Sequence, residues 1–379
     1  PVNFYRAIQN RSPEGIAGAV ALTFMGARVD SWPPGRLKDM ALFFSEVGYK
    51  PTREWKEECV FWDPLHTSQP AANVAPEKSA RKAKPAQAAP EPSTPEGPQT
   101  AVLPDGTTTT LSPEQDPREA FANWLIAPEN PYFTRAIVNR VWYWLLGRGI
   151  IHEPDDIRDD NPPSNPELLA YLEKELVAGH YNLKRLYRLI ASSSTYQLSS
   201  MPRRIDEQAQ ANFASYPIRR LDAEVLIDAI NRITGTTDLY TSPIPEPFTY
   251  IPHDMPAIAI ADGSITSPFL TLFGRSARAT GLESERNNKP VPAQWLHMLN
   301  SSHIQSKLQQ GPALRAIFTS GRKQAEIIDE LYLTILSRLP TADERKMIAE
   351  YIRSARGKGN VAIDVPWALI NSPEFLYRH

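Results

Sequence analysis

Apolar residues recur at helical spacing along most of the chain, and this pattern predicts a mainly helical protein. The clearest run begins after Asp116-Pro117, where apolar positions three and four residues apart continue to Gly147. A glycine just past an apolar run is typical of a helix C-terminus. The same spacing predicts further helices at residues 219–233, 292–308, 323–337 and 343–355.

Three stretches depart from the helical pattern. Residues 67–98 consist largely of Ala, Pro, Lys and Glu, so they lack the apolar surface needed to offset the entropy of ordering. Pro104-Asp105-Gly106 lies between two short Thr-rich runs and predicts a β-hairpin. Residues 236–291 carry many prolines and no sustained period, which predicts long ordered loops with short strands.

These patterns together predict a domain organisation. We expect a small helical segment at residues 1–66, a flexible Pro/Ala-rich linker at 67–98 and a main helical domain at 99–379. The expected class is mainly α: a multi-helix globular domain with a minor β-hairpin and long ordered loops.

Composition narrows the possible partners and cofactors. The net charge of −2 disfavours broad electrostatic binding to nucleic acid, so we predict no nucleic-acid partner. The single cysteine, Cys59, excludes a disulfide framework, a four-cysteine zinc site and covalent haem attachment within this chain. No apolar run approaches the roughly 20 residues that span a bilayer. We therefore predict no membrane span and no cofactor, with calcium as the one metal to consider.

The densest group of charges is an acidic segment. Asp155, Asp156, Asp159 and Asp160 could supply oxygens to Ca²⁺, which takes six to eight of them, although their spacing is not that of an EF-hand loop. The alternative is an ion-paired loop, because arginines surround these acids. Those arginines are Arg135, Arg140 and Arg148, from the preceding helix.

Two other constellations leave alternatives open. Arg135, Asn139 and Trp142 share a helical face, which suits a groove for a carboxylate, sulfate or sugar, or a buried polar network. Glu224 and Asp228 are four residues apart on one predicted helix. This spacing fits either the two carboxylates of a hydrolase or an exposed, ion-paired helix face. Glu283, Glu285 and Arg286 raise the same question in a loop.

The histidines do not predict a zinc site. No His-Glu-x-x-His motif occurs, and His297 and His303 are expected to face in different directions on one helix.

Several motifs in order resemble the domain of unknown function 1553 family, found in planctomycetes and associated with cytochrome c domains. They are Asn130-Pro-Tyr-Phe-Thr-Arg135, Val138-Asn-Arg-Val-Trp142, Leu146-Gly-Arg-Gly-Ile150, Asn161-Pro-Pro-Ser-Asn-Pro166, Arg220-Leu-Asp-Ala-Glu224, Phe273-Gly-Arg275, Glu283-Ser-Glu-Arg286 and Leu336-Ser-Arg-Leu-Pro-Thr341. The resemblance covers the C-terminal half of such proteins, preceded by the tail of the usual partner domain. It implies a periplasmic, cell-envelope or secreted protein associated with polysaccharide use.

A departure from the family pattern bears on haem chemistry. Family members often carry Cys-x-x-Cys-His after a segment like Phe24-Met-Gly26, and this chain continues there without cysteine. The leading hypothesis is therefore a binding or scaffold module for a protein partner or polysaccharide. The alternative is a hydrolase or other enzyme acting on (sulfated) polysaccharide. A third is an accessory part of a cytochrome-type redox system with haem on another domain.

The hypotheses differ in what they expect of the candidate residues. Convergence of Arg135, Asn139, Asp156 and Glu224 in one pocket would favour an enzyme or ligand site, and dispersal into separate ion pairs would favour a scaffold. The full set of ligand-binding candidates is Arg135, Asn139, Arg140, Trp142, Arg148, Asp155, Asp156, Arg158, Glu224, Arg275, Glu285 and Arg286.

Overall fold

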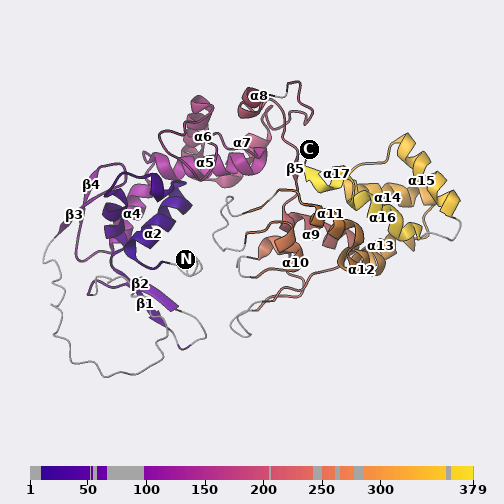
Figure 1. Cartoon of the computed structure of the whole chain (residues 1–379), viewed down its shortest axis with the longest axis horizontal. Helices are drawn as coiled ribbons and strands as arrows, with labels where there is room; N and C mark the ends of the chain where they lie inside the picture. Colours follow the sequence, from indigo (N-terminus) through magenta and orange to yellow (C-terminus); the bar gives the residue numbers. More distant parts are fainter. Residues whose placement is uncertain are drawn as a thin grey trace. The chain divides into compact units, whose positions relative to one another are not determined.

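The computed structural model confirms the mainly α class (Figure 1). It describes residues 10–51, 53, 58–65, 98–204, 206–241, 250–260, 265–276, 286–287, 289–355 and 360–378. Almost all of the predicted linker, residues 67–97, lies outside this part. The chain forms two compact units. The first contains residues 1–198 and 202–215, and the second contains residues 199–201 and 216–379.

The first unit combines helices with two antiparallel strand pairs. Its helices are α2 (Pro13–Val20), α3 (Arg36–Ala41), α4 (Pro117–Ile126), α5 (Pro131–Leu146), α6 (Pro166–Ala178), α7 (Leu183–Ala191) and α8 (Glu207–Ala211). A π-helical turn η1 (Ala21–Met25) extends α2, and short 3-10 turns η2 (Val29–Ser31) and η3 (Leu42–Phe44) flank α3. Strand β1 (Val47–Pro51) pairs with β2 (Glu58–Trp62). Strand β3 (Gln99–Val102) pairs with β4 (Thr108–Leu111), which confirms the predicted hairpin.

Local sequence sets the ends of these helices. Ser12 caps α2, since its hydroxyl accepts the Gly15 N–H at 3.1 Å. Asn130 caps α5 in the same way through Oδ1, which accepts the Tyr132 N–H at 2.9 Å. Gly147 ends α5 in the left-handed conformation, with φ of 75°, where a side chain would add strain.

One core holds the first unit together across a long stretch of sequence. Met25, Met40 and Phe43 from the N-terminal helices pack in one cluster with Phe121 and Leu125 of α4. The rings of Phe43 and Phe121 lie 5.4 Å apart. The N-terminal segment and the first helices after residue 98 therefore bury their apolar faces against each other.

The second unit is built around α9 (Ala223–Thr234). Its remaining helices are η4 (Ala257–Ala259), α10 (Pro268–Leu272), α11 (Pro292–Asn300), α12 (Ser302–Gln310), α13 (Pro312–Phe318), α14 (Gln324–Leu336), α15 (Ala342–Ala355), α16 (Val361–Ile370) and α17 (Pro373–Leu376). Strands β5 (Arg219–Arg220) and β6 (Tyr377–Arg378) pair antiparallel and join its two ends. Leu226, Ile227 and Ile230 project from one face of α9 into the core.

The prediction of a single helix over residues 292–308 is wrong. The chain breaks at Ser301, whose extended backbone (ψ of 141°) separates α11 from α12. The Ser301 hydroxyl then caps α12 by accepting the Ile304 N–H at 3.2 Å. In the predicted loop region 236–291, the described residues form the short helices η4 and α10 instead of strands.

Candidate functional site

The most buried of the predicted charged residues, Asp155, forms an ion pair in the first unit. Nε of Arg140 on α5 lies 2.7 Å from Oδ1 of Asp155, whose side chain is only 2% exposed. The same guanidinium donates to the carbonyl oxygens of Leu22, at 2.6 Å, and Thr23. These carbonyls belong to η1, at the negative end of a helix, where a cation is favoured. Arg140 thus joins three segments of the unit.

The side chains of Asn139 and Trp142 are buried and hold parts of the first unit together. Asn139 is fully buried, and its amide both donates to the Ile151 carbonyl (2.8 Å) and accepts the Ile151 N–H (2.9 Å). Trp142 is buried and packs edge-on against Phe213, with ring centroids 5.2 Å apart. Neither side chain lies with Arg135 in a shared groove, because Arg135 instead pairs with Glu173 of α6 at 2.8 Å.

The acidic loop is arranged as ion pairs. Arg158 lies 3.2 Å from Asp156 and 3.3 Å from Asp160, while Asp159 is exposed. In the part of the chain that the structure describes, no group of three or more acidic, histidine or cysteine side chains is placed to hold a metal ion. Arg148 is half-buried, and its Nε has no hydrogen-bond partner there.

In the second unit, Glu224 forms ion pairs with two arginines. Arg286 binds it through two hydrogen bonds, of 2.9 and 2.8 Å, and Nε of Arg275 lies 3.3 Å from Oε1. The Glu224 side chain is 5% exposed. Burial alone would raise the pKa of Glu224, but the hydrogen bonds and charge of Arg286, together with the charge of Arg275, outweigh it and hold the pKa below its ordinary value.

The two carboxylates predicted as a hydrolase pair have separate partners. Asp228 accepts the N–H groups of Ala257 (2.7 Å) and Ile258 (3.0 Å), and so anchors the first turn of η4 to α9. The guanidinium of Arg275 also donates to the carbonyls of Ile260 and Ile265. Glu283 and Glu285 lie outside the described residues.

His297, His303 and Asp238 form a hydrogen-bonded row that the sequence did not predict, called here the histidine chain. Nε2 of His297 on α11 lies 3.3 Å from Nδ1 of His303 on α12, and Nε2 of His303 lies 2.8 Å from Oδ1 of Asp238. The expectation that these histidines face apart is wrong because the break at Ser301 turns α12 back toward α11. The Ser after an apolar run was the available signal, since Ser is a common helix cap.

A buried lysine holds Asp238, the carboxylate at one end of the histidine chain. Lys307 is buried, and its ammonium lies 3.1 Å from Asp238 and 2.6 Å from Oδ1 of Asn231. Burial would raise the pKa of Asp238, but its hydrogen bond from His303 and the charge of Lys307 lower it overall. Asp238 is therefore a carboxylate that accepts from Nε2–H of His303. With both imidazoles neutral, Nδ1 of His303 accepts from Nε2–H of His297, and Nδ1 of His297 is the proton acceptor.

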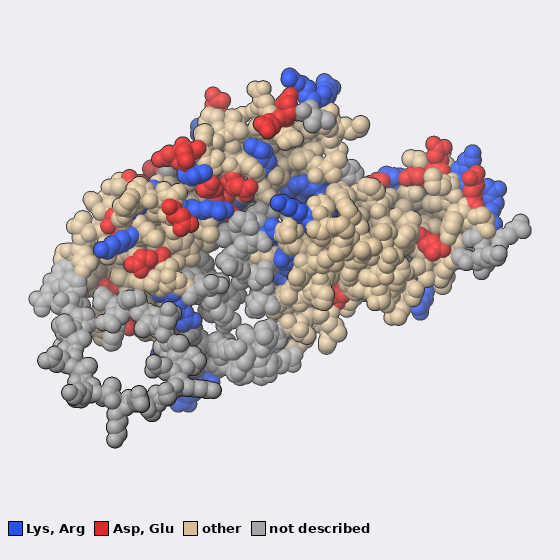
Figure 2. Space-filling model, in the orientation of Figure 1, with Lys and Arg blue, Asp and Glu red and all other residues tan. Residues whose placement is uncertain are grey.

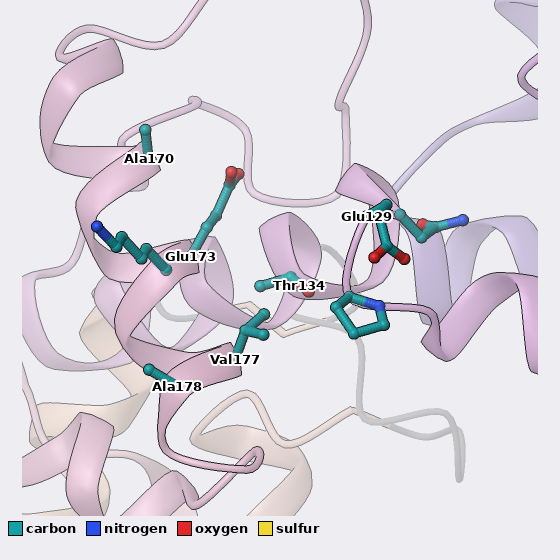
Figure 3. A pocket seen from close by; sticks show the side chains of 9 residues that line it. Glu129, Thr134, Ala170, Glu173, Val177 and Ala178 are labelled. Carbon is teal, nitrogen blue, oxygen red and sulfur yellow. The ribbon is translucent and has the colours of Figure 1, made fainter.

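An open pocket of about 460 Å³ lies in the first unit, between the turn that joins α4 to α5 and one face of α6 (Figure 3). It is lined by Pro128, Glu129, Asn130, Thr134, Ala170, Glu173, Lys174, Val177 and Ala178. Figure 3 shows Thr134 between Val177 and Glu129. Of the residues predicted to bind a ligand, none lines this pocket, although Arg135 pairs with its Glu173.

Comparison with known families gives one match. The profile of the proteins of unknown function DUF1553 (PSD1) matches residues 117–352, which is more than half of the chain. The chain belongs to the DUF1553 family. We found no match among curated proteins or among solved structures.

The residues matched by the DUF1553 profile include most of the ion pairs and hydrogen bonds of the candidate site. The Arg140–Asp155 pair, the Glu224 cluster and the histidine chain all lie within residues 117–352. The carbonyls of Leu22 and Thr23 that Arg140 binds lie outside it. Among the described helices of this DUF1553 protein, none has the length and apolar character to cross a membrane. Figure 2 shows acidic and basic side chains interspersed on the visible face of the first unit.

Proposed function

We propose that this DUF1553 protein is a non-catalytic, extracytoplasmic binding or scaffold module for a protein partner or polysaccharide. One observation carries the proposal: the charged residues that could have formed an active site are dispersed into separate structural pairs. Arg135 pairs with Glu173, Asp156 with Arg158, and Glu224 with Arg286. Asn139 binds backbone alone. A catalytic carboxylate needs a position within reach of substrate, and these carboxylates are held by arginines instead.

The experiment compares binding with turnover. The purified chain is incubated with neutral and sulfated polysaccharides, and its thermal unfolding and the release of new reducing ends are measured together. A ligand of the folded state raises the unfolding temperature. A raised temperature without new reducing ends supports a binding module. Steady release of reducing ends by the purified chain would overturn the proposal.

A second candidate function is acid–base catalysis at the histidine chain. The observation that favours it is the alignment of Asp238, His303 and His297, in which a carboxylate orients one imidazole and that imidazole orients the next. His297 would then act as the proton acceptor. If turnover is found in the polysaccharide assay, His297→Gln should abolish it, while Asp156→Asn and Asp228→Asn test the predicted carboxylates as alternatives.

A further inference from the structure

We propose that Lys307 is a positioning residue of the histidine chain, which sets the direction of its hydrogen bonds so that His297 presents a proton-accepting nitrogen. The proposal rests on the second candidate function, acid–base catalysis at His297, and explains why this imidazole would act as a base. Its basis is that a buried ammonium and an imidazole contact the same oxygen of Asp238.

The distances within the histidine chain allow its hydrogen bonds to run in either of two directions. In the first, Nε2–H of His297 donates to Nδ1 of His303, Nε2–H of His303 donates to Asp238, and Nδ1 of His297 carries no proton. In the second, Nδ1–H of His303 donates to Nε2 of His297, whose own proton then lies on Nδ1. The first direction presents a base at the end of the chain, and the second presents an N–H donor.

The second direction requires an additional proton beside Asp238. Nε2 of His303 lies 2.8 Å from Oδ1 of Asp238 and must share a proton with it to form a hydrogen bond. With Nδ1 of His303 already protonated, either Nε2 is protonated as well, which makes His303 an imidazolium, or Asp238 is protonated and donates to Nε2. The charges around Asp238 therefore decide between the two directions.

Lys307 of α12 disfavours both of these protonated states. Its ammonium lies 3.1 Å from the oxygen that His303 contacts, so an imidazolium would place a second cation against one oxygen. A protonated Asp238 would leave the ammonium without its carboxylate, on a lysine side chain that is only 6% exposed. The first direction needs neither state, because the charges of Lys307 and Asp238 already balance.

Oxygen atoms around the ammonium hold it in this position. Nζ of Lys307 lies 2.6 Å from Oδ1 of Asn231, 3.3 Å from Oγ1 of Thr236 and 3.4 Å from the Thr237 carbonyl oxygen. Asn231 also donates from Nδ2 to Oδ2 of Asp238, at 3.2 Å. The end of α9 and the residues after it therefore fix the ammonium and the carboxylate together.

The opposite end of the histidine chain does not impose a direction. His297 is half-buried, and among the described residues its Nδ1 has no hydrogen-bond partner. The ring of Phe269 is edge-on to both imidazoles, and the ring of Phe273 is edge-on to His297 with centroids 6.1 Å apart. These rings carry no exchangeable proton, so the direction is set at Asp238.

The test locates the imidazole protons by NMR on the whole chain. Long-range ¹H–¹⁵N spectra at about pH 7.5, above the ordinary pKa of histidine, show which ring nitrogens are protonated. His297→Gln and His303→Gln assign the signals. In the wild-type chain, we expect both imidazoles to carry a proton on Nε2 alone. Lys307→Gln keeps polar atoms and removes the charge, so the proton of His297 should move to Nδ1.

Two further variants separate charge from structure. Lys307→Arg keeps a cation beside Asp238 and should retain the wild-type proton positions. Lys346→Gln removes a positive charge from an exposed position on α15 and should leave the proton of His297 on Nε2. If the polysaccharide assay gives turnover, Lys307→Gln should lower it roughly tenfold or more, and Lys307→Arg should retain it better.

The wild-type spectrum tests the proposal without any substitution, since a proton on Nδ1 of His297 would overturn it. A folded Lys307→Gln chain in which that proton stays on Nε2 would overturn it too, because Asp238 alone would then set the direction. Failure of the second candidate function is seen separately. An absence of turnover would reject catalysis at His297 while the proton positions still establish the role of Lys307.

Discussion

Nε2 of His297 lies 3.3 Å from Nδ1 of His303, across the point where α11 ends and α12 begins. At this distance one ring donates its N–H to the other, and two protonated rings would repel each other. Phe269 adds an apolar wall, with its ring edge-on to both imidazoles at centroid distances of 5.5 and 5.8 Å. Burial and the neighbouring His303 therefore both disfavour a positive charge on His297.

A first prediction concerns stability below neutral pH. Burial, and then the neighbouring His303, lower the pKa of His297 below its ordinary 6.5. The unfolded chain then binds this proton more readily than the folded one, so stability is complete above pH 6.5 and falls as pH drops toward the folded pKa. Urea unfolding from pH 5 to 8 should show this slope, and His297→Gln should reduce it. An NMR titration of His297 with a midpoint at or above 6.5 would contradict the prediction.

A second prediction concerns Glu224 and more acidic conditions. Its pKa is held below the ordinary 4.5 by the hydrogen bonds of Arg286 and the charges of both arginines, against the opposing effect of burial. Its contribution is therefore present above pH 4.5 and is lost as pH falls through the folded pKa. Glu224→Gln should cost about 3 kcal/mol in free energy of unfolding at pH 7, because it leaves the buried guanidinium of Arg275 and the partly buried one of Arg286 without a carboxylate. Urea unfolding at pH 7 and pH 4 measures both effects. An equal loss at both pH values would show that the charge of Glu224 is not responsible.

A third prediction uses two aspartates from one loop. Asp155→Ala removes the partner of a mostly buried Arg140 and should cost about 3–5 kcal/mol. Asp159→Ala, at an exposed position, should change the free energy of unfolding by less than about 0.5 kcal/mol. Tryptophan fluorescence in urea follows both, since Trp142 lies in the same unit. Equal effects of the two substitutions would contradict the role given to the buried pair.

A fourth prediction contrasts two glycines. A Cβ on Gly149 would lie 2.2 Å from the Ile151 carbonyl oxygen and 3.1 Å from the Asn139 amide, so Gly149→Ala must displace backbone and disturb the Asn139 bridge. We expect a loss of more than about 1 kcal/mol. A Cβ on Gly18, within α2, would meet Val29 at 3.5 Å, an ordinary contact. Gly18→Ala should therefore stabilise the chain by roughly 0.5–1 kcal/mol. Thermal unfolding distinguishes the two, and destabilisation by both would show that α2 does not tolerate the added methyl group.

Much of the fold follows from local rules. The stop predicted at Gly147 is confirmed, and the caps at Ser12 and Asn130 are equally short-range features. The hairpin around Gly106 follows from its turn residues in the same way. The break at Ser301 was missed because apolar positions continue through it, so periodicity alone gives one helix.

The candidate site could be predicted only in its composition. The sequence shows that Arg140, Asp155, Glu224 and Arg286 are unusual, and the structure supplies their pairing. Glu224 and Arg286 are 62 residues apart and are brought together by tertiary packing, which no local sequence pattern encodes. The pocket was missed for a related reason. Its lining, from Pro128 to Ala178, is chemically ordinary and is brought together only by the packing of α6 against the turn between α4 and α5.

The hydrogen bonds from Arg140 to the carbonyls of Leu22 and Thr23 join residues inside the DUF1553 match to residues outside it. The DUF1553 match starts at residue 117. This boundary cuts through one hydrophobic core, because the apolar residues of α4 pack against helices far upstream in the sequence. Excision at that boundary would strip Phe121 and Leu125 of their packing and leave a buried cation facing water where carbonyls had been. The smallest piece of this half that folds independently is therefore expected to include α2, α3 and the 3-10 turns beside them as well as the matched residues.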